Sequence, residues 1–268
     1  MTCIWEYLVK VALFQNSPAF GEIERNIDSM LAASEDRDFD LLVLPELFAT
    51  GYQFISVEEA LSLADPAGEG FTYEKMKKLA ADRKALVVYG FPEVDKGRLF
   101  NSAIAVFPYG RYHKYRKIHL FNTEKEIFEP GREGFSVFEY KGSKIGLMIC
   151  FDWRFPEAAR RLALDGAQII CHPSNLVLPH CPDAMITRAL ENNVFTITCN
   201  RIGTENRTGQ SLTFIGKSRI IAPDGRILGG LEENEVGWLE MEIDPQLADN
   251  KQITPRNEIF SDRHPEFY

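Results

Sequence analysis

Cys150 ends an apolar run and precedes a turn, which is a position where a thiol can act as a nucleophile. Ile145, Leu147 and Ile149 alternate with Gly146, Met148 and Cys150, and this period of two predicts a strand. Pro156 and the apolar spacing after it predict a helix that begins just downstream. We therefore expect the thiol at the carboxyl end of a strand, close to backbone N–H groups that can receive an oxyanion. The alternative is a buried packing cysteine.

Two other segments supply residue types that would complete a catalytic group. The apolar stretch 39–45 ends in the carboxylate Glu46, and the aromatic-rich stretch 112–120 contains the cation Lys117. A thiol, a carboxylate and an ammonium group can serve as nucleophile, proton carrier and oxyanion stabiliser. The three residues together indicate nucleophilic catalysis more strongly than the cysteine does alone.

The segments around these residues resemble the nitrilase superfamily of carbon–nitrogen hydrolases. They follow the family's order, Glu then Lys then Cys, and the resemblance runs from about Val11 to the end of the chain. The matching landmarks are Leu-Pro-Glu at 44–46, Tyr-Arg-Lys-Ile-His-Leu at 115–120 and Ile-Cys-Phe-Asp-Trp-Arg-Phe-Pro-Glu at 149–157, with further family-like stretches at 128–131, 172–175 and 188–192.

The resemblance implies a role for each catalytic residue. Glu46 would be the general base, Lys117 the oxyanion-stabilising cation and Cys150 the nucleophile. Family members often carry a second glutamate near the lysine, and Glu124 fits that position better than Glu126. The alternative for this stretch is a solvated charged loop.

Four residues are candidates for substrate binding. The resemblance places the backbone N–H of Phe151 in the oxyanion hole with Lys117. Asn175, at the end of a strand-like segment, is expected to contact substrate or to cap the local turn. Tyr52 and Trp153 are candidate pocket walls, although most aromatic residues are part of the core.

The residues near these motifs suggest supporting roles. His119 would share a strand face with Lys117 and orient that lysine or Glu46, or it is purely structural. Adjacent Cys and His residues at 171–172 and 180–181 do not have zinc-site spacing, so we predict no metal site and a buried, hydrogen-bonded His172. A polar network that braces the site is expected from Arg188, Glu191, Asn200 and Arg201.

The elements that position these residues alternate between helix and strand, which predicts an α/β fold. Helices are expected near 23–31, 71–83, 156–163 and 183–193, and strands near 8–14, 41–44, 85–91, 100–107, 111–115, 135–140, 144–150, 168–172, 194–200, 214–231 and 235–243. No linker divides the chain, so we predict a single domain over 1–268. The family resemblance implies a four-layer α-β-β-α sandwich.

Composition excludes several classes of function. The chain has 268 residues and a net charge of −9, which argues against a nucleic-acid partner. Its apolar stretches are too short to span a membrane, and its start does not resemble a signal peptide. Its five cysteines, an odd number scattered through a large chain, favour a reducing cytoplasm. They are Cys3, Cys150, Cys171, Cys181 and Cys199.

The function that we predict is cofactor-independent hydrolysis of a small non-peptide amide through a cysteine thioester. The sequence Cys-Phe-Asp at 150–152 favours an amidase, because nitrilases proper usually carry Cys-Trp-Glu. A nitrilase or an N-carbamoyl amide hydrolase is the alternative, and an inactive scaffold would be expected to lack one of the three residues. We also expect a homodimer or higher homo-oligomer, with the apolar tail 253–268 at the subunit interface.

Overall fold

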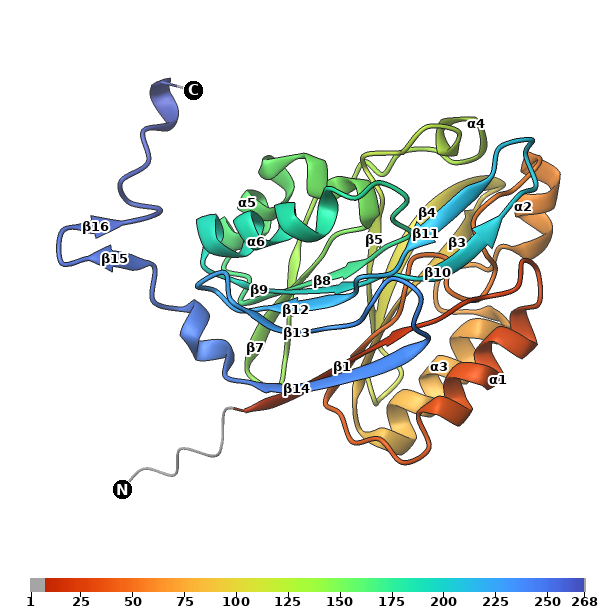
Figure 1. The fold of residues 1–268 in the computed structure, drawn as a ribbon, viewed down its shortest axis with the longest axis horizontal. Helices are drawn as coiled ribbons and strands as arrows, with labels where there is room; N and C mark the ends of the chain where they lie inside the picture. Colours follow the sequence, from red (N-terminus) through yellow and green to blue (C-terminus); the bar gives the residue numbers. More distant parts are fainter. Residues whose placement is uncertain (1–7, 268) are drawn as a thin grey trace.

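Six strands in the spatial order β14–β1–β2–β3–β4–β5 form the first sheet of the computed structural model, which describes residues 8–267 (Figure 1). Strands β1, β2 and β3 are parallel, whereas β14 pairs antiparallel with β1, β4 pairs antiparallel with β3, and β5 pairs antiparallel with β4. In that spatial order the strands are Gly237–Ile243, Val9–Gln15, Leu41–Val43, Leu86–Asp95, Arg98–Val106 and Tyr112–Arg116. Cys3 and Tyr268 lie outside the described residues.

The second sheet also has six strands, in the order β13–β12–β9–β8–β7–β6. Its three central strands β7, β8 and β9 are parallel. The strands are Ile227–Gly230, Arg219–Ile221, Phe195–Cys199, Ile169–Pro173, Ser143–Leu147 and Val137–Tyr140. Each sheet therefore has parallel strands at its centre, whose carboxyl ends are the usual place for a site in α/β proteins.

The two sheets pack face to face and helices cover their outer faces. Strands β2 and β3 lie against β8 and β9. Helices α1 (Ile23–Ala33) and α3 (Gly70–Arg83) cover the first sheet, and α5 (Pro156–Leu164) and α6 (Cys181–Asn192) cover the second (Figure 1). This arrangement is the predicted α-β-β-α sandwich.

Alternating residues of β1 show why the central strands are apolar on both faces. Val11 and Leu13 belong to the core between the sheets, whereas Ala12 and Phe14 pack under α1 and α3. Both faces of the strand are thus buried, which removes the polar alternation of a surface strand.

Several short elements near the site have no clear sequence signal. They are α2 (Val57–Leu63), the single-turn helix α4 (Glu124–Ile127), the short helix η2 (Cys150–Arg154) and the hairpin of β10 (Ile202–Glu205) and β11 (Leu212–Ile215). A helix of one turn is too short to show an amphipathic period. The described part of the chain contains no helix that is long and apolar enough to cross a membrane.

The strand before Cys150 ends earlier than we predicted. Strand β7 stops at Leu147, and the predicted strand had continued to Cys150. The Met148 N–H still donates to a carbonyl of β8, 3.0 Å away, but the Ile149 N–H donates to the Asp152 carboxylate at 2.8 Å. The carboxylate of Asp152 therefore takes the place of a strand carbonyl as hydrogen-bond acceptor for Ile149, and the chain turns into η2.

The C-terminal segment extends away from the sandwich (Figure 1). It contains η3 (Pro245–Ala248), β15 (Gln252–Thr254), β16 (Asn257–Glu258) and η4 (Pro265–Phe267). Phe260 packs against the sandwich, where its ring lies 5.3 Å from the charged groups of Arg160 and Lys251. Beyond it the segment leaves Phe267 81% exposed.

Candidate active site

Glu46 follows β2 and is completely buried. A Cβ at position 90 would lie 2.5 Å from the Glu46 Cα, so Gly90 allows β3 to pass beside this carboxylate. Glu46 Oε1 accepts hydrogen bonds from Lys117 Nζ and Asn101 Nδ2, both at 2.7 Å. Glu46 Oε2 is buried and has no partner among the described residues. Burial raises the pKa of Glu46, although Lys117 opposes the shift.

Lys117 lies immediately after β5 and is also completely buried. Its backbone N–H donates to the carbonyl of Asn101 at 2.8 Å, and its carbonyl accepts from Gly131 at 2.9 Å. Its Nζ lies 2.7 Å from an oxygen of Glu46 and 2.7 Å from an oxygen of Glu124. Burial alone would lower the pKa of Lys117, but these carboxylates outweigh it and raise that pKa, so the ammonium stays charged.

Glu124, and not Glu126, is the glutamate that contacts Lys117. Glu126 is exposed, whereas Glu124 is 3% exposed and its Oε2 accepts from the Phe121 N–H at 3.1 Å. Glu124 Oε1 also accepts from the Tyr52 hydroxyl at 2.7 Å. Tyr52, which we predicted as a pocket wall, is buried in this polar cluster, where Glu124 pairs its hydroxyl.

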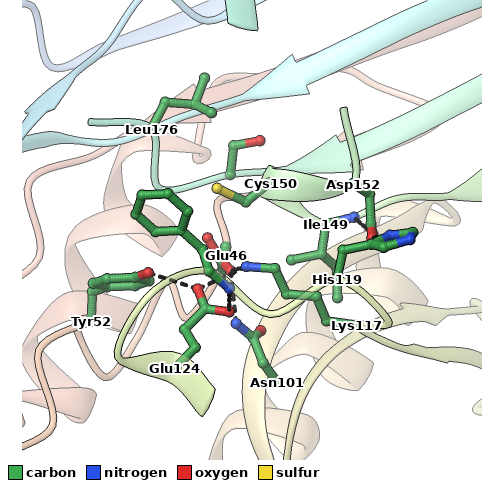
Figure 2. A network of polar contacts seen from close by, with 12 residues as sticks. Glu46, Tyr52, Asn101, Lys117, His119, Glu124, Ile149, Cys150, Asp152 and Leu176 are labelled. Carbon is green, nitrogen blue, oxygen red and sulfur yellow. Dashed lines mark hydrogen bonds and ion pairs between the residues drawn. The ribbon is translucent and has the colours of Figure 1, made fainter. Parts of the chain in front are cut away.

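Cys150 is the first residue of η2, and its thiol lies beside Glu46 and Lys117 (Figure 2). Its backbone is left-handed, with φ of +39°, which is uncommon for a residue with a side chain. The ring Nε2 of His172 lies 2.8 Å from the Cys150 carbonyl and donates to it. Burial raises the pKa of Cys150 well above its usual value, and the negative charge of Glu46 adds to this effect. The resting thiol is therefore protonated.

The turn after Cys150 is held by the carboxylate of Asp152 (Figure 2). It accepts from the Ile149 N–H at 2.8 Å and from the Tyr115 hydroxyl at 2.9 Å, and it lies 2.7 Å from His119 Nδ1. The ring of His119 stacks on Phe155 with centroids 3.8 Å apart. His119 therefore contacts Asp152, which agrees with the structural alternative rather than with a role in orienting Lys117 or Glu46. Strand β5 ends before His119, so the strand alternation does not extend that far.

A pocket opens beside the Cys150 thiol. Its volume is about 20 Å³, which is room for one or two water molecules. Phe151, Trp153 and Asn175, which are three of the four residues that we predict to bind substrate, line it. The complete lining is Phe121, Cys150, Phe151, Trp153, Asn175, Leu176, Val177 and Leu178. Tyr52, the fourth candidate, lines a separate small pocket together with Glu124.

Polar side chains brace the segments that carry the pocket residues. Arg188 Nε donates to the Trp153 carbonyl at 3.2 Å, and Arg188 also pairs with Glu191 at 2.8 Å. Asn200 Oδ1 accepts from the Leu176 N–H at 2.8 Å. These contacts agree with the predicted bracing network.

Sequence reasoning missed three supporting residues, Asn101, Asp152 and Glu205. Glu205 pairs with the buried Arg201 and accepts the Gln53 N–H at 2.7 Å, which fixes the segment around Tyr52. Asn101 had a usable signal, since it is a polar residue inside an apolar strand. Among the described residues, no group of three or more His, Cys, Asp or Glu could hold a metal ion.

The hydrogen bond from His172 to the Cys150 carbonyl should support the strained backbone of the nucleophile. Burial lowers its pKa to about 4, so the ring is neutral at physiological pH and donates through Nε2. His172→Leu should leave the Cys150 carbonyl unpaired, lower kcat and destabilise the fold by about 1–3 kcal/mol. Denaturant unfolding and steady-state kinetics measure both effects. His172→Gln, which retains a donor, should recover part of each, and equal behaviour of the two variants would refute this role.

Comparison with known proteins identifies the family. The carbon–nitrogen hydrolase family model matches residues 10–251. The chain belongs to the nitrilase superfamily, in its amidase-like branch. It is 46% identical to a nitrilase of Pyrococcus abyssi over 97% of this chain and 99% of that protein. It is 33% identical to an (R)-stereoselective amidase of a Pseudomonas species, over 90% of this chain and 87% of that protein.

Solved structures of this superfamily have the same fold. A Glu-to-Gln, Cys-to-Ala double mutant of the amidase from Nesterenkonia sp. AN1, in complex with acrylamide, aligns with a TM-score of 0.81 and 25% identity. The alignment covers 100% of this chain and 98% of that one. The family and its members support a hydrolase of carbon–nitrogen bonds.

Proposed function

We propose that this hydrolase cleaves the C–N bond of a small non-peptide amide through a thioester on Cys150. The observation that carries the proposal is the buried cluster of Glu46, Lys117 and Glu124 beside a protonated thiol. Glu46 uses one oxygen to hold Lys117 and leaves Oε2 without a partner. An unpaired buried carboxylate oxygen is suited to accept a proton.

In the first half-reaction, the Cys150 sulfur attacks the amide carbonyl while Glu46 accepts the thiol proton. Lys117 and the backbone N–H of Phe151 stabilise the oxyanion of the tetrahedral intermediate. The C–N bond then breaks, and Glu46 gives its proton to the departing nitrogen. Ammonia or an amine leaves, and the acyl group remains on Cys150 as a thioester.

In the second half-reaction, Glu46 accepts a proton from water, whose oxygen attacks the thioester carbonyl. The C–S bond breaks, the acid leaves and the proton returns to the sulfur. Glu124 holds Lys117 together with Glu46, and Tyr52 fixes Glu124 through a hydrogen bond. Every step uses side chains and backbone of this chain, so the reaction requires no metal or organic cofactor.

A panel of small amides, N-carbamoyl compounds and nitriles tests the substrate class by ammonia release, with a chelator present throughout. The protein should act on amides and retain this activity with the chelator. Activity on nitriles alone would favour the nitrilase alternative, for which the Pyrococcus relative is the supporting observation. Loss on chelation with recovery on adding zinc would contradict the cofactor-free mechanism. Similarity to the acrylamide-bound amidase supports small amides as the first probes.

We further propose that residues 1–268 act as one domain in the cytoplasm. Glu46 and Lys117 follow strands of the first sheet and Cys150 follows a strand of the second, so neither half has a complete site. Cys150, Cys171, Cys181 and Cys199 are free thiols, which suits a reducing compartment. The catalytic thiol in particular must remain reduced.

The tail 253–268 is proposed to lie at the interface of a homodimer. Ile253 is 63% exposed and Phe267 is 81% exposed, so the tail carries apolar area that its own sandwich leaves uncovered. A chain ending near Lys251 should show weaker dimerisation than the full chain by light scattering. A truncated protein that remains fully dimeric would refute the role of the tail, and an active full-length monomer would refute the dimer.

A further inference from the structure

The pocket beside Cys150 is almost entirely apolar. Its polar side-chain groups are the Cys150 thiol, the indole N–H of Trp153 and the amide of Asn175, and no Lys, Arg, His, Asp or Glu lines it. Burying a charge in such surroundings without a counter-charge is costly. An acyl group that enters this pocket should therefore be uncharged, and the pocket volume of about 20 Å³ favours a short one.

Asn175 has a rigid backbone and an unused side chain. Its neighbours are fixed, because the Ser174 N–H donates to the Cys199 carbonyl at 2.9 Å and the Leu176 N–H donates to Asn200 at 2.8 Å. Its own backbone N–H faces the Cys150 thiol, where it acts to lower the pKa of that thiol against the larger effect of burial. The residue is only 2% exposed. Nevertheless, Oδ1 and Nδ2 of its side chain both lack a hydrogen-bond partner in the described part of the chain.

Buried amide groups are normally paired, and leaving one unpaired costs free energy. The two unpaired atoms therefore indicate that a ligand completes the hydrogen bonding of Asn175. The acyl carbon would be bonded to the sulfur that the Asn175 N–H contacts. The first atoms of the acyl chain are thus the nearest part of a substrate to this residue.

Building on the proposed function, we propose that Asn175 is a specificity-determining residue that recognises an uncharged hydrogen-bonding group next to the scissile carbonyl. A hydroxyl at that carbon both donates and accepts, and it matches the acceptor Oδ1 and the donor Nδ2. The preferred substrate class is then a short, neutral 2-hydroxyamide. Amides that carry an ammonium or a carboxylate group at that carbon are disfavoured.

The test compares kcat/KM for lactamide and propionamide, which differ by one hydroxyl. The wild-type protein should prefer lactamide by about tenfold or more, the effect of one good hydrogen bond in a buried site. In Asn175→Leu, which has a similar size and no polar atoms, the ratio should fall to about one. Equal rates on the two amides with wild-type protein, or an unchanged ratio in Asn175→Leu, would overturn the inference.

Asn175→Asp supplies a second variant of nearly identical shape. It should improve the rate on alaninamide relative to lactamide, measured where the amine is protonated, because the new carboxylate pairs with the ammonium group. No change in that ratio would count against the inference. A propionyl thioester on Cys150 without any lactamide preference would leave the proposed function intact, whereas no acyl-enzyme from any amide of the panel would remove the proposed function itself.

Discussion

Replacing Cys150 with alanine is expected to lower kcat by roughly 10⁴-fold or more, the scale seen when a catalytic nucleophile is removed. The physical reason is that no other thiol of the described chain lines the pocket. Circular dichroism and thermal unfolding should show an intact fold, because the change removes only one sulfur atom. The measurement is ammonia release from the best amide of the panel.

Two further variants make this prediction specific. Cys150→Ser should be nearly as inactive, because a serine hydroxyl titrates far above a thiol and Glu46 is a weak base. Cys171→Ala is the matched control, since Cys171 is also a completely buried thiol but lies in β8 among core residues. It should retain activity. Substantial turnover by Cys150→Ala would remove the assignment of the nucleophile.

Glu46→Gln is expected to lower kcat/KM by about 10²–10⁴-fold, the usual contribution of a general base. Glutamine retains the shape and can still accept hydrogen bonds from Lys117 and Asn101, but it cannot take the thiol proton. Glu126→Gln is the matched control, because Glu126 is exposed on the same helix as Glu124. That control should have wild-type activity, and a fully active Glu46→Gln would contradict the role of Glu46 as base.

The pH dependence of the wild-type protein follows from the same carboxylate. Burial raises the pKa of Glu46, and the carboxylate must be ionised to accept a proton. As pH falls through this raised pKa, kcat/KM should decrease, at a higher pH than an exposed glutamate would give. His172, whose pKa is lowered to about 4, does not contribute to this decrease of kcat/KM. Lys117 stays charged throughout, because its pKa is raised.

The sequence predicted the parts of the site that lie in short local motifs. Glu46, Lys117 and Cys150 each follow a strand. The runs before Glu46 and Cys150 are apolar or alternating, whereas Lys117 follows an aromatic-rich stretch and was assigned from the family resemblance. The role of Gly90 could not be predicted from the sequence. Its close approach to Glu46 depends on how β2 and β3 pair, and this is a contact between residues far apart in the chain.

The features of the site that local sequence patterns could not predict all depend on side-chain or tertiary contacts. The end of β7 depends on the Asp152 side chain, which takes the N–H of Ile149, and strand periodicity contains no information about that hydrogen bond. Likewise, the hydrogen bond from Tyr52 to Glu124 joins residues far apart in the chain, so local sequence patterns could not predict it. Helix α4 has only one turn and shows no period, so its presence follows from tertiary contacts.

The central claim is that an acyl group is transferred to Cys150. The most direct measurement is the mass of the acid-quenched protein during turnover of an amide, followed by mapping of the modified peptide and by addition of hydroxylamine. We expect an added acyl group on Cys150 and release of the corresponding hydroxamate when hydroxylamine is present. Amide turnover with neither an adduct on Cys150 nor a hydroxamate would contradict it.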